Sequence, residues 1–197
     1  MDNTLKNYRS KTRKLVIIGM LGGISIFLGL TPLGIIHLPV MNLTIMHIPV
    51  IIGAILEGPL VGGSIGLIFG LFSMYQNITA PNLTSFIFMN PIIALLPRIL
   101  IGIVTYYVYA FIKNKFKNKS ISIGVASIAG TLTNTIGVLG LTYILYLDRY
   151  AAAKQISTDM VAGALLTVVG TNGIAEAIAS AVIAIPVVTA LSKIRKF

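Results

Sequence analysis

The sequence predicts an all-α integral membrane protein, a bundle of about six transmembrane helices with both termini on the cytoplasmic side. Of the 197 residues, 56% are hydrophobic and only 10% are charged, whereas about a quarter of the residues of a typical soluble domain carry a charge. Long apolar runs also recur from one end of the chain to the other. We therefore expect a single six-helix membrane domain over residues 1–197, with no separate soluble domain.

The apolar runs define the expected spans. A helix needs roughly 20 residues to cross about 30 Å of hydrocarbon, and fewer where neighbouring helices shelter it. The first run follows a basic N-terminus, as in a signal peptide, but no small-residue cleavage site follows it, and we interpret it as a retained helix. The expected spans are residues 13–30, 45–58, 60–76, 84–112, 121–147 and 159–192.

The basic residues set the expected orientation. The formal net charge is +10, and most basic residues lie in three short segments that flank spans. Such clusters mark the cytoplasmic side of a plasma membrane with anionic lipids, and six spans would place all three there. They are not interleaved with aromatic residues, which argues against nucleic-acid binding. The clustered residues are Lys6, Arg9, Lys11, Arg13, Lys14, Lys113, Lys115, Lys117, Lys119, Lys193, Arg195 and Lys196.

The expected connections differ between the two faces. On the inner face, residues 57–59 form a minimal turn between the second and third spans. On the outer face, the links over residues 31–44, 76–84 and 147–158 are longer and contain polar residues. Long outer loops over a helical bundle suggest a lid or the mouth of a binding site, and simple connection is the alternative.

Small residues recur at four-residue spacing in two of the expected helices. Gly19 and Gly23 form one such ridge, and Gly62, Gly66 and Gly70 form the other. Lipid tails provide no hydrophobic drive for helix association, so close backbone approach at such ridges favours packing. Most ridges of this kind pack within one subunit, but a ridge on the first helix could face a partner protein.

Two ionisable residues lie near the middle of expected spans, Arg98 in the fourth and Glu176 in the sixth. Charged groups at this depth are costly and usually face a cavity or a partner. One interpretation is an ion pair that locks the two helices together. The other is that Arg98 faces a ligand carboxylate, which a guanidinium can bind through two parallel hydrogen bonds.

Amide and hydroxyl groups accompany these charges at similar depth. Asn90, Ala94 and Arg98 follow at four-residue spacing on one helix face, and we expect Pro91 and Pro97 to free backbone carbonyls there. The fifth span carries a similar face, and Asn172 precedes Glu176 by one turn. We therefore expect a polar pocket in the outer half of spans four to six. Further members of these faces are Thr131, Asn134, Thr135, Val138 and Thr171.

No constellation in the sequence supports an enzyme. Cysteine is absent, which excludes thiol nucleophiles and thiolate metal sites. There is no phosphate-binding lysine loop, metal-binding histidine cluster or nucleophile elbow. We therefore expect no catalytic residue, metal or cofactor. His47 lies beside the first outer loop and is a candidate ligand contact, although a hydrogen-bonded structural histidine is the alternative.

Four segments carry a resemblance to a known family. Residues 44–59 (TIMHIPVIIGAILEGP), 96–102 (LPRILIG), 132–135 (LTNT) and 169–176 (VGTNGIAE) occur in this order. Together they resemble the S components, the substrate-capturing subunits, of energy-coupling factor (ECF) vitamin transporters, and within that group the pantothenate type. The resemblance covers nearly the whole chain.

The resemblance implies six helices with a vitamin pocket near the outer face, beneath the first loop. It also implies a transmembrane coupling subunit and two ATPase subunits as partners, and a chain that topples in the membrane to deliver its cargo. The family's first helix contacts the coupling subunit through small residues, often alanines, which correspond here to Gly19 and Gly23.

Pantothenate is the vitamin that this resemblance favours. Its carboxylate would suit Arg98, and its amide and hydroxyls would suit polar side chains. Another vitamin or precursor, such as riboflavin, a pyridoxine-like compound or a queuosine precursor, is the alternative, as is a small channel or a structural membrane protein. The candidate substrate-binding residues are Asn90, Arg98, Asn134, Thr171, Asn172, Glu176 and His47.

Overall fold

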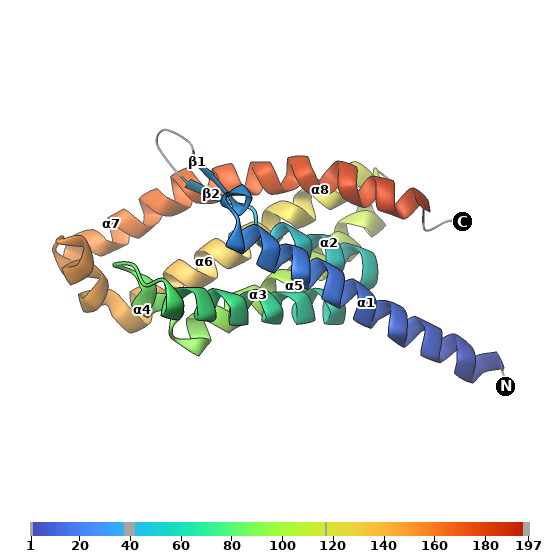
Figure 1. Cartoon of the computed structure of the whole chain (residues 1–197). Coiled ribbons are helices and arrows are strands. Elements are labelled where there is room, and N and C mark those ends of the chain that lie inside the picture. The colour runs from blue at the N-terminus through green and yellow to red at the C-terminus, as the bar shows by residue number, and fades with distance from the viewer. Residues whose placement is uncertain (1, 38–41, 117, 195–197) are drawn as a thin grey trace.

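The computed structural model describes residues 2–37, 42–116 and 118–194, and helices make up most of them (Figure 1). A short 3₁₀ turn, Pro32–Gly34, follows the first helix, and a π-helical segment, Val169–Gly173, joins the last two. The α-helices are α1 (Asp2–Leu30), α2 (Ile48–Glu57), α3 (Pro59–Thr79), α4 (Ser85–Phe88), α5 (Pro91–Lys115), α6 (Lys119–Lys154), α7 (Thr158–Val168) and α8 (Ile174–Ile194).

Five of these helical segments are long and apolar enough to cross a membrane, which confirms the expected all-α membrane class. The expected second span is shorter, because α2 has 10 residues and so a length of about 15 Å. The five segments are Lys11–Leu30, Pro59–Thr79, Pro91–Lys115, Lys119–Lys154 and Thr158–Ile194.

Two expected boundaries differ from the structure. The span expected at 84–112 is divided, because Asn90 caps a new helix in which Pro91 is the first residue. Proline is favoured at this position, where its missing N–H is not needed, so Pro91 starts α5 and does not interrupt it. The link expected at 147–158 is mostly helical, since α6 continues to Lys154 beyond a kink at Tyr146 (φ −138°, ψ 29°).

The link expected at 31–44 contains a small antiparallel hairpin. Strand β1 (Ile35–His37) pairs with strand β2 (Asn42–Thr44), and Ile35 lies opposite Thr44. The hairpin thus brings Thr44 to the end of a fixed element just before α2. Pairing of backbone groups explains why this link is ordered in its described part, although its composition gave no strand signal.

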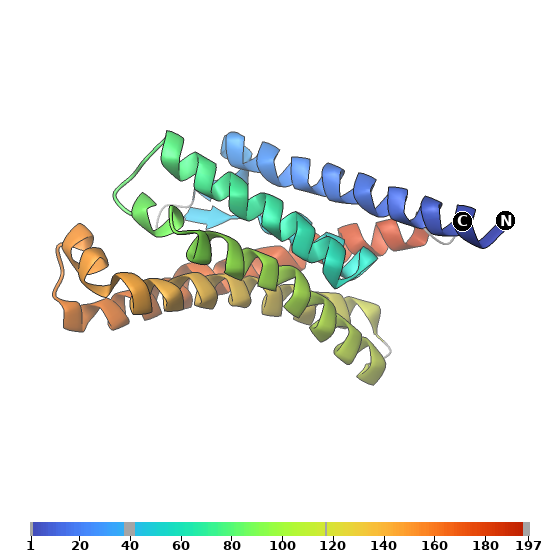
Figure 2. The same cartoon turned by 90° about the horizontal axis from the view of Figure 1, so that it is seen from below.

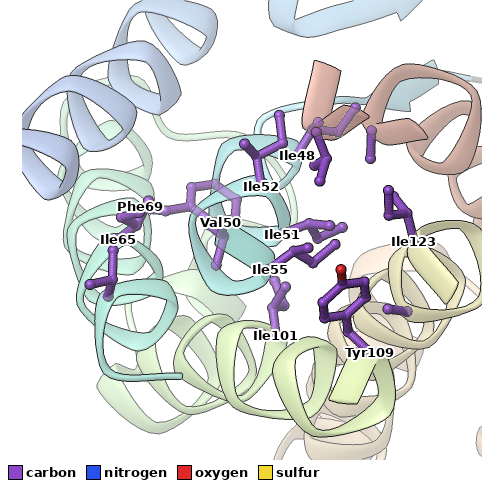
Figure 3. Packing of buried hydrophobic residues seen from close by; sticks show 14 of the residues in the cluster. Ile48, Val50, Ile51, Ile52, Ile55, Ile65, Phe69, Ile101, Tyr109 and Ile123 are labelled. Atoms are coloured by element: carbon purple, nitrogen blue, oxygen red, sulfur yellow. The ribbon is translucent and has the colours of Figure 1, made fainter. Parts of the chain in front are cut away.

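The short helix α2 forms the centre of the core. Eight of its 10 residues are buried, which explains why its sequence is apolar on all sides. Figure 3 shows its side chains pointing in several directions, with Val50 near Phe69 and Ile51 directed towards Ile123. The other long helices surround α2, so a helix too short to face lipid alone is covered by its neighbours.

The two ends of the bundle differ. The start of α1, the end of α8 and the α5–α6 connection lie at one end, which we call the terminal end (Figures 1 and 2). Helix α4, the kink in α6 and the turn into α7 lie at the opposite end, which we call the kink end. The clustered basic residues of the sequence therefore gather at the terminal end. Of these, Lys117, Arg195 and Lys196 lie outside the described residues.

The glycines of α3 are internal packing positions. A side chain on Gly62 would meet Ala54 and the backbone at Gly102, and one on Gly66 would overlap the carbonyl oxygen of Arg98. Gly70 likewise faces the carbonyl oxygen of Ala94. Helices α3 and α5 therefore approach backbone to backbone along this ridge, as expected for small residues between membrane helices.

The glycines of α1 behave differently. Gly22 and Gly29 face Ile68 and Phe72 of α3, whereas a Cβ added to Gly19 or Gly23 would meet nothing within 4 Å. The ridge of Gly19 and Gly23 is therefore unused by the described part of this chain. A close-approach surface without an internal partner remains on the outside of α1.

The α3–α5 contact predicts opposite effects of alanine at two neighbouring glycines. Gly66→Ala should destabilise the protein by about 1–3 kcal/mol, because the new methyl group overlaps backbone that cannot rotate away. Gly63→Ala is the matched control, since a Cβ there makes only an ordinary 3.7 Å contact with Ile99, and alanine favours the helix. Thermal unfolding in detergent measures both. Equal stability of the two variants would contradict this packing.

Candidate functional site

Arg98 is the centre of the site. Its side chain is 4% exposed, and its Nη1 donates a hydrogen bond of 2.8 Å to the carbonyl oxygen of Ile93. In an uninterrupted helix that carbonyl would accept from the N–H of residue 97. Residue 97 is a proline inside α5 and has no N–H to donate. The expectation that Pro97 frees a carbonyl is met, and Arg98 itself uses this carbonyl.

Aromatic rings hold the guanidinium of Arg98 on its faces. Its central carbon lies 5.6 Å from the ring centroid of Phe69 and 4.9 Å from that of Phe88. Such cation–π contacts are stabilising where water is excluded. The Nε atom is buried and has no hydrogen-bond partner in the part of the chain that the structure describes. One edge of the guanidinium is therefore anchored, and a donor on the same group remains unsatisfied.

The ion pair considered between Arg98 and Glu176 is not formed. Within the described residues, no carboxylate oxygen lies within 4.0 Å of the Arg98 guanidinium. Glu176 instead accepts two hydrogen bonds from Thr44, one of 2.8 Å from its backbone N–H and one of 2.6 Å from its hydroxyl. Glu176 thus fastens the end of the hairpin to α8, and the helix-locking interpretation of the pair is wrong.

His47 belongs to a buried hydroxyl network. Its side chain is 1% exposed, and its Nε2 lies 3.0 Å from the hydroxyl of Thr131. That hydroxyl is also 2.8 Å from Ser180 Oγ and 3.0 Å from the carbonyl oxygen of Ser127. Since a hydroxyl has one donor and two acceptor sites, the three contacts are compatible.

The amides of the predicted pocket have different surroundings. Asn134, one turn from Thr131 on α6, has a buried Oδ1 without a hydrogen-bond partner. Asn90 is used at the helix terminus, where its Oδ1 accepts from the N–H of Ile92 at 2.9 Å and its Nδ2 donates to Tyr146 at 3.2 Å. The grouping of Asn90 with Arg98 on one helix face is therefore wrong, because Asn90 precedes the helix.

The π-helical segment before α8 carries the remaining candidates. The hydroxyl of Thr171 donates to the carbonyl oxygen of Thr167 at 2.8 Å, and the Thr171 side chain is exposed. Asn172 is partly buried, and its Oδ1 lies 3.1 Å from the Thr171 hydroxyl. A Cβ on Gly173 would contact Thr135 at 3.2 Å, so this segment packs closely against α6. Such π-helical turns are frequent at functional sites.

The structure thus gives each of these candidates its own contacts: Glu176 binds Thr44, His47 binds Thr131, and Arg98 binds the Ile93 carbonyl between two aromatic rings. It also adds four residues that were not among the sequence candidates. Thr44 and Ser180 could have been suspected from position, because Thr44 ends the outer link and Ser180 follows Glu176 by one turn. For Phe69 and Phe88 the sequence carries no signal, since apolar aromatics occur throughout the chain.

This arrangement suits a polar anion. A buried guanidinium with an unsatisfied Nε can donate to a carboxylate in charge-assisted hydrogen bonds. The unsatisfied Oδ1 of Asn134 can accept from a hydroxyl or an amide N–H. These two atoms are among five buried side-chain polar atoms of the described residues that have no hydrogen-bond partner, and each such atom calls for an explanation.

Comparison with protein families identifies the class. A family described as "ECF transporter, substrate-specific component" matches residues 13–188. The chain therefore belongs to the substrate-specific, or S, components of ECF transporters. It is a transporter subunit and not an enzyme, and its apolar helices make it a multi-pass protein of the plasma membrane. This membership favours substrate capture over the small channel or structural protein considered from the sequence.

Two curated relatives are similar over much of the chain. The pantothenic acid transporter PanT of Lactococcus lactis subsp. cremoris is 32% identical over 148 residues, which are 68% of this chain and 69% of the relative. The pantothenate transporter PanT of Leuconostoc mesenteroides subsp. mesenteroides is 31% identical over 120 residues, or 59% of each chain. With the second relative, the match therefore spans less than two thirds of either protein.

The contact between Thr44 and Glu176 predicts an energetic coupling. Thr44→Val should destabilise the wild type by about 1.5–3 kcal/mol, because it removes a hydroxyl bound to a carboxylate. In a Glu176→Gln background the same change should cost clearly less, since the charge-assisted bond is already lost. Thermal unfolding of the single and double variants measures the coupling.

A matched control separates this coupling from the general cost of removing a threonine hydroxyl. Thr133 is partly buried on α6, and its hydroxyl bonds only to Ala129 of its own helix, at 2.8 Å. The cost of Thr133→Val should be the same in both backgrounds. Additive costs for Thr44→Val and Glu176→Gln would show that the hairpin is not held by this contact.

Proposed function

We propose that this chain is the pantothenate-binding S component of an ECF importer, with the carboxylate of the vitamin bound by Arg98. The observation that carries the proposal is the buried guanidinium, which among the described residues has an unsatisfied Nε and no carboxylate oxygen within 4.0 Å. Both relatives named above are pantothenate transporters by name. Pantothenate supplies one carboxylate, and its amide and hydroxyl groups can bond with neutral polar side chains such as Asn134, whose buried Oδ1 has no hydrogen-bond partner among the described residues.

The roles of the remaining residues follow from their positions. Asn134 accepts a hydrogen bond from a vitamin hydroxyl or amide, and His47 is held by Thr131 beside the carboxylate. Glu176 acts indirectly, because it fixes the hairpin over the site through Thr44. Thr171 and Asn172 line the site from the π-helical segment. Asn90 is proposed to bind substrate only at the kink end, where its side chain lies.

A single domain of six crossings with both termini in the cytoplasm is part of the proposal. The ion pair of 2.6 Å between Arg13 and Glu57 joins the end of α2 to the start of the first span. Helix α2 therefore returns the chain towards the terminal end, although its neighbours shelter it from lipid. The basic residues gathered at that end favour the cytoplasmic side.

Transport requires partners in this proposal. The chain captures the vitamin from outside, and a transmembrane coupling subunit with two ATPase subunits drives its import. The ridge of Gly19 and Gly23 supports a docking role for α1, because it faces open space in the described part of this chain. Close helix–helix approach is what such a ridge provides.

Ligand screening tests the proposal directly. The purified chain in detergent is titrated with pantothenate, riboflavin, pyridoxine and a queuosine precursor, with thermal stabilisation as the readout. Of these four compounds, only pantothenate should raise the unfolding temperature of the protein at low ligand concentration. In liposomes the chain alone should give no concentrative uptake with ATP, whereas uptake should follow when the coupling and ATPase subunits are added. Stabilisation by another vitamin only would overturn the assignment.

The role of Arg98 predicts a specific loss of acid recognition. Arg98→Lys should weaken pantothenate binding by roughly 2–5 kcal/mol, because lysine keeps the charge but cannot form two parallel hydrogen bonds. Binding of the neutral amide analogue should change much less. Isothermal titration of both ligands to the folded variant measures the preference. A retained preference for the acid together with lower stability would make Arg98 purely structural.

The open ridge on α1 predicts a loss of assembly without a loss of binding. Gly19→Leu or Gly23→Leu should reduce co-purification with the coupling subunit by tenfold or more, on the order of 1.4 kcal/mol, while pantothenate affinity stays unchanged. Gly140→Leu is the matched control, because Gly140 on α6 also faces open space but lies off this ridge. Normal assembly of Gly23→Leu would assign the docking surface elsewhere.

A further inference from the structure

A cleft with polar side chains in its lining lies at the kink end, and Arg98 is not part of it. Its volume is about 340 Å³, and it is formed where α4, the start of α5 and the kink of α6 meet. The kink directs the last residues of α6 across the end of the bundle (Figure 1). The residues that line the cleft are Phe86, Met89, Asn90, Pro91, Tyr146 and Arg149.

Arg149 gives this cleft a positive charge. Its guanidinium carbon lies 4.4 Å from the ring centroid of Phe86, a cation–π contact that holds the group at the cleft. Within the described residues, no carboxylate oxygen lies within 4.0 Å of Arg149, although Asp148 is adjacent in sequence. An oriented and unpaired guanidinium suits a planar oxyanion.

Tyr146 adds a neutral hydrogen-bond donor. Its hydroxyl oxygen accepts from Asn90 Nδ2 at 3.2 Å, and the ring meets Phe86 edge to face at 5.4 Å. The hydroxyl hydrogen has no acceptor in the described part of the chain and can be donated into the cleft. The cleft thus combines a guanidinium and a phenol donor around one opening.

Helix α4 connects this cleft with the buried site. Phe86 stacks on Arg149, whereas Phe88, two residues later, stacks on Arg98. The helix is fixed to α3, because Ser85 Oγ donates to Asn77 Oδ1 at 2.8 Å. Asn90 and Arg98 are eight residues apart, which corresponds to about 12 Å along α5. Arg98 therefore lies about two helical turns along α5 from Asn90, which lines the cleft.

We propose that the cleft is an outer oxyanion site where the substrate carboxylate binds first, before it reaches Arg98. The proposal rests on the proposed function above. Arg149 attracts and orients the anion at the surface, and Tyr146 donates the second hydrogen bond. A charge at the rim acts mainly on the association rate, whereas a buried charge contact acts mainly on dissociation. The two arginines therefore have separable kinetic roles.

Binding kinetics of the full chain test this site. Pantothenate association is followed by surface plasmon resonance on protein immobilised in phospholipid-free maltoside micelles. Arg149→Gln should lower the association rate constant by about threefold to tenfold and flatten its dependence on salt, with an unchanged dissociation rate. Arg149→Lys should restore part of the loss. Association of the neutral amide analogue should not change.

A matched control removes an equal charge outside the cleft. Lys154→Gln lies at the end of the same helix, is exposed, and does not line the cleft. It should leave the association rate within about twofold of the wild type. If both variants slow association equally, the effect comes from the overall positive charge of the outer surface. That result would contradict a specific site at Arg149.

The remaining outcomes are also decisive. If the wild type binds no pantothenate at equilibrium, the proposed function fails, and the outer substrate site fails with it. If it binds pantothenate but Arg149→Gln associates at the wild-type rate, only the outer site fails. A lipid phosphate is the other source of an oxyanion. An effect of Arg149→Gln seen only in nanodiscs with phosphatidylglycerol, and absent in micelles, would assign the cleft to lipid and contradict the proposal.

Discussion

The hydrogen bond between Arg98 and the carbonyl oxygen of Ile93 is the interaction around which the site is arranged. It exists because residue 97 is a proline, which leaves that carbonyl without its usual helical donor. Inside a membrane, every backbone oxygen needs a partner from the protein itself. The arginine satisfies this oxygen and is anchored by it, while Phe69 and Phe88 cover its faces. In the proposed function, this anchored guanidinium is the donor for the vitamin carboxylate.

The backbone of Arg98 is positioned by close packing between helices α3 and α5. The carbonyl oxygen of Arg98 lies against Gly66 of α3, where no larger residue fits. The glycine ridge of α3 therefore sets the depth and rotation of α5, and with them the direction of the guanidinium. The ridge of α1 has the same spacing but no internal contact at Gly19 and Gly23. Two ridges that look alike in sequence thus differ in the structure, because one packs within the subunit and the other has no internal contact at these glycines, which supports the docking role proposed above.

The sequence predicted what depends on composition and depth, and missed what depends on local geometry. Apolar runs and basic clusters predicted the membrane class and most spans, and burial cost singled out Arg98 and Glu176. Their partners could not be predicted, because the contact of Glu176 with Thr44 joins residues 132 positions apart through a hairpin without a strand signal. Asn90 was predicted to lie inside a helix, but it precedes α5 and caps it. The sequence does not distinguish a capping asparagine from an asparagine that lines a pocket.

The central claim is that Arg98 contacts the vitamin carboxylate, and a distance measurement tests it most directly. The chain is labelled with ¹⁵N-arginine, reconstituted in lipid and loaded with pantothenate that carries ¹³C at its carboxylate, and solid-state NMR measures the dipolar coupling between them. The chain has five arginines, so the Arg98→Lys variant is measured as well to show which signal comes from Arg98. The account predicts a guanidinium nitrogen within about 4 Å of the carboxylate carbon, and that this coupling disappears in Arg98→Lys. Bound pantothenate without such a coupling, or with one that survives the substitution, would contradict the account.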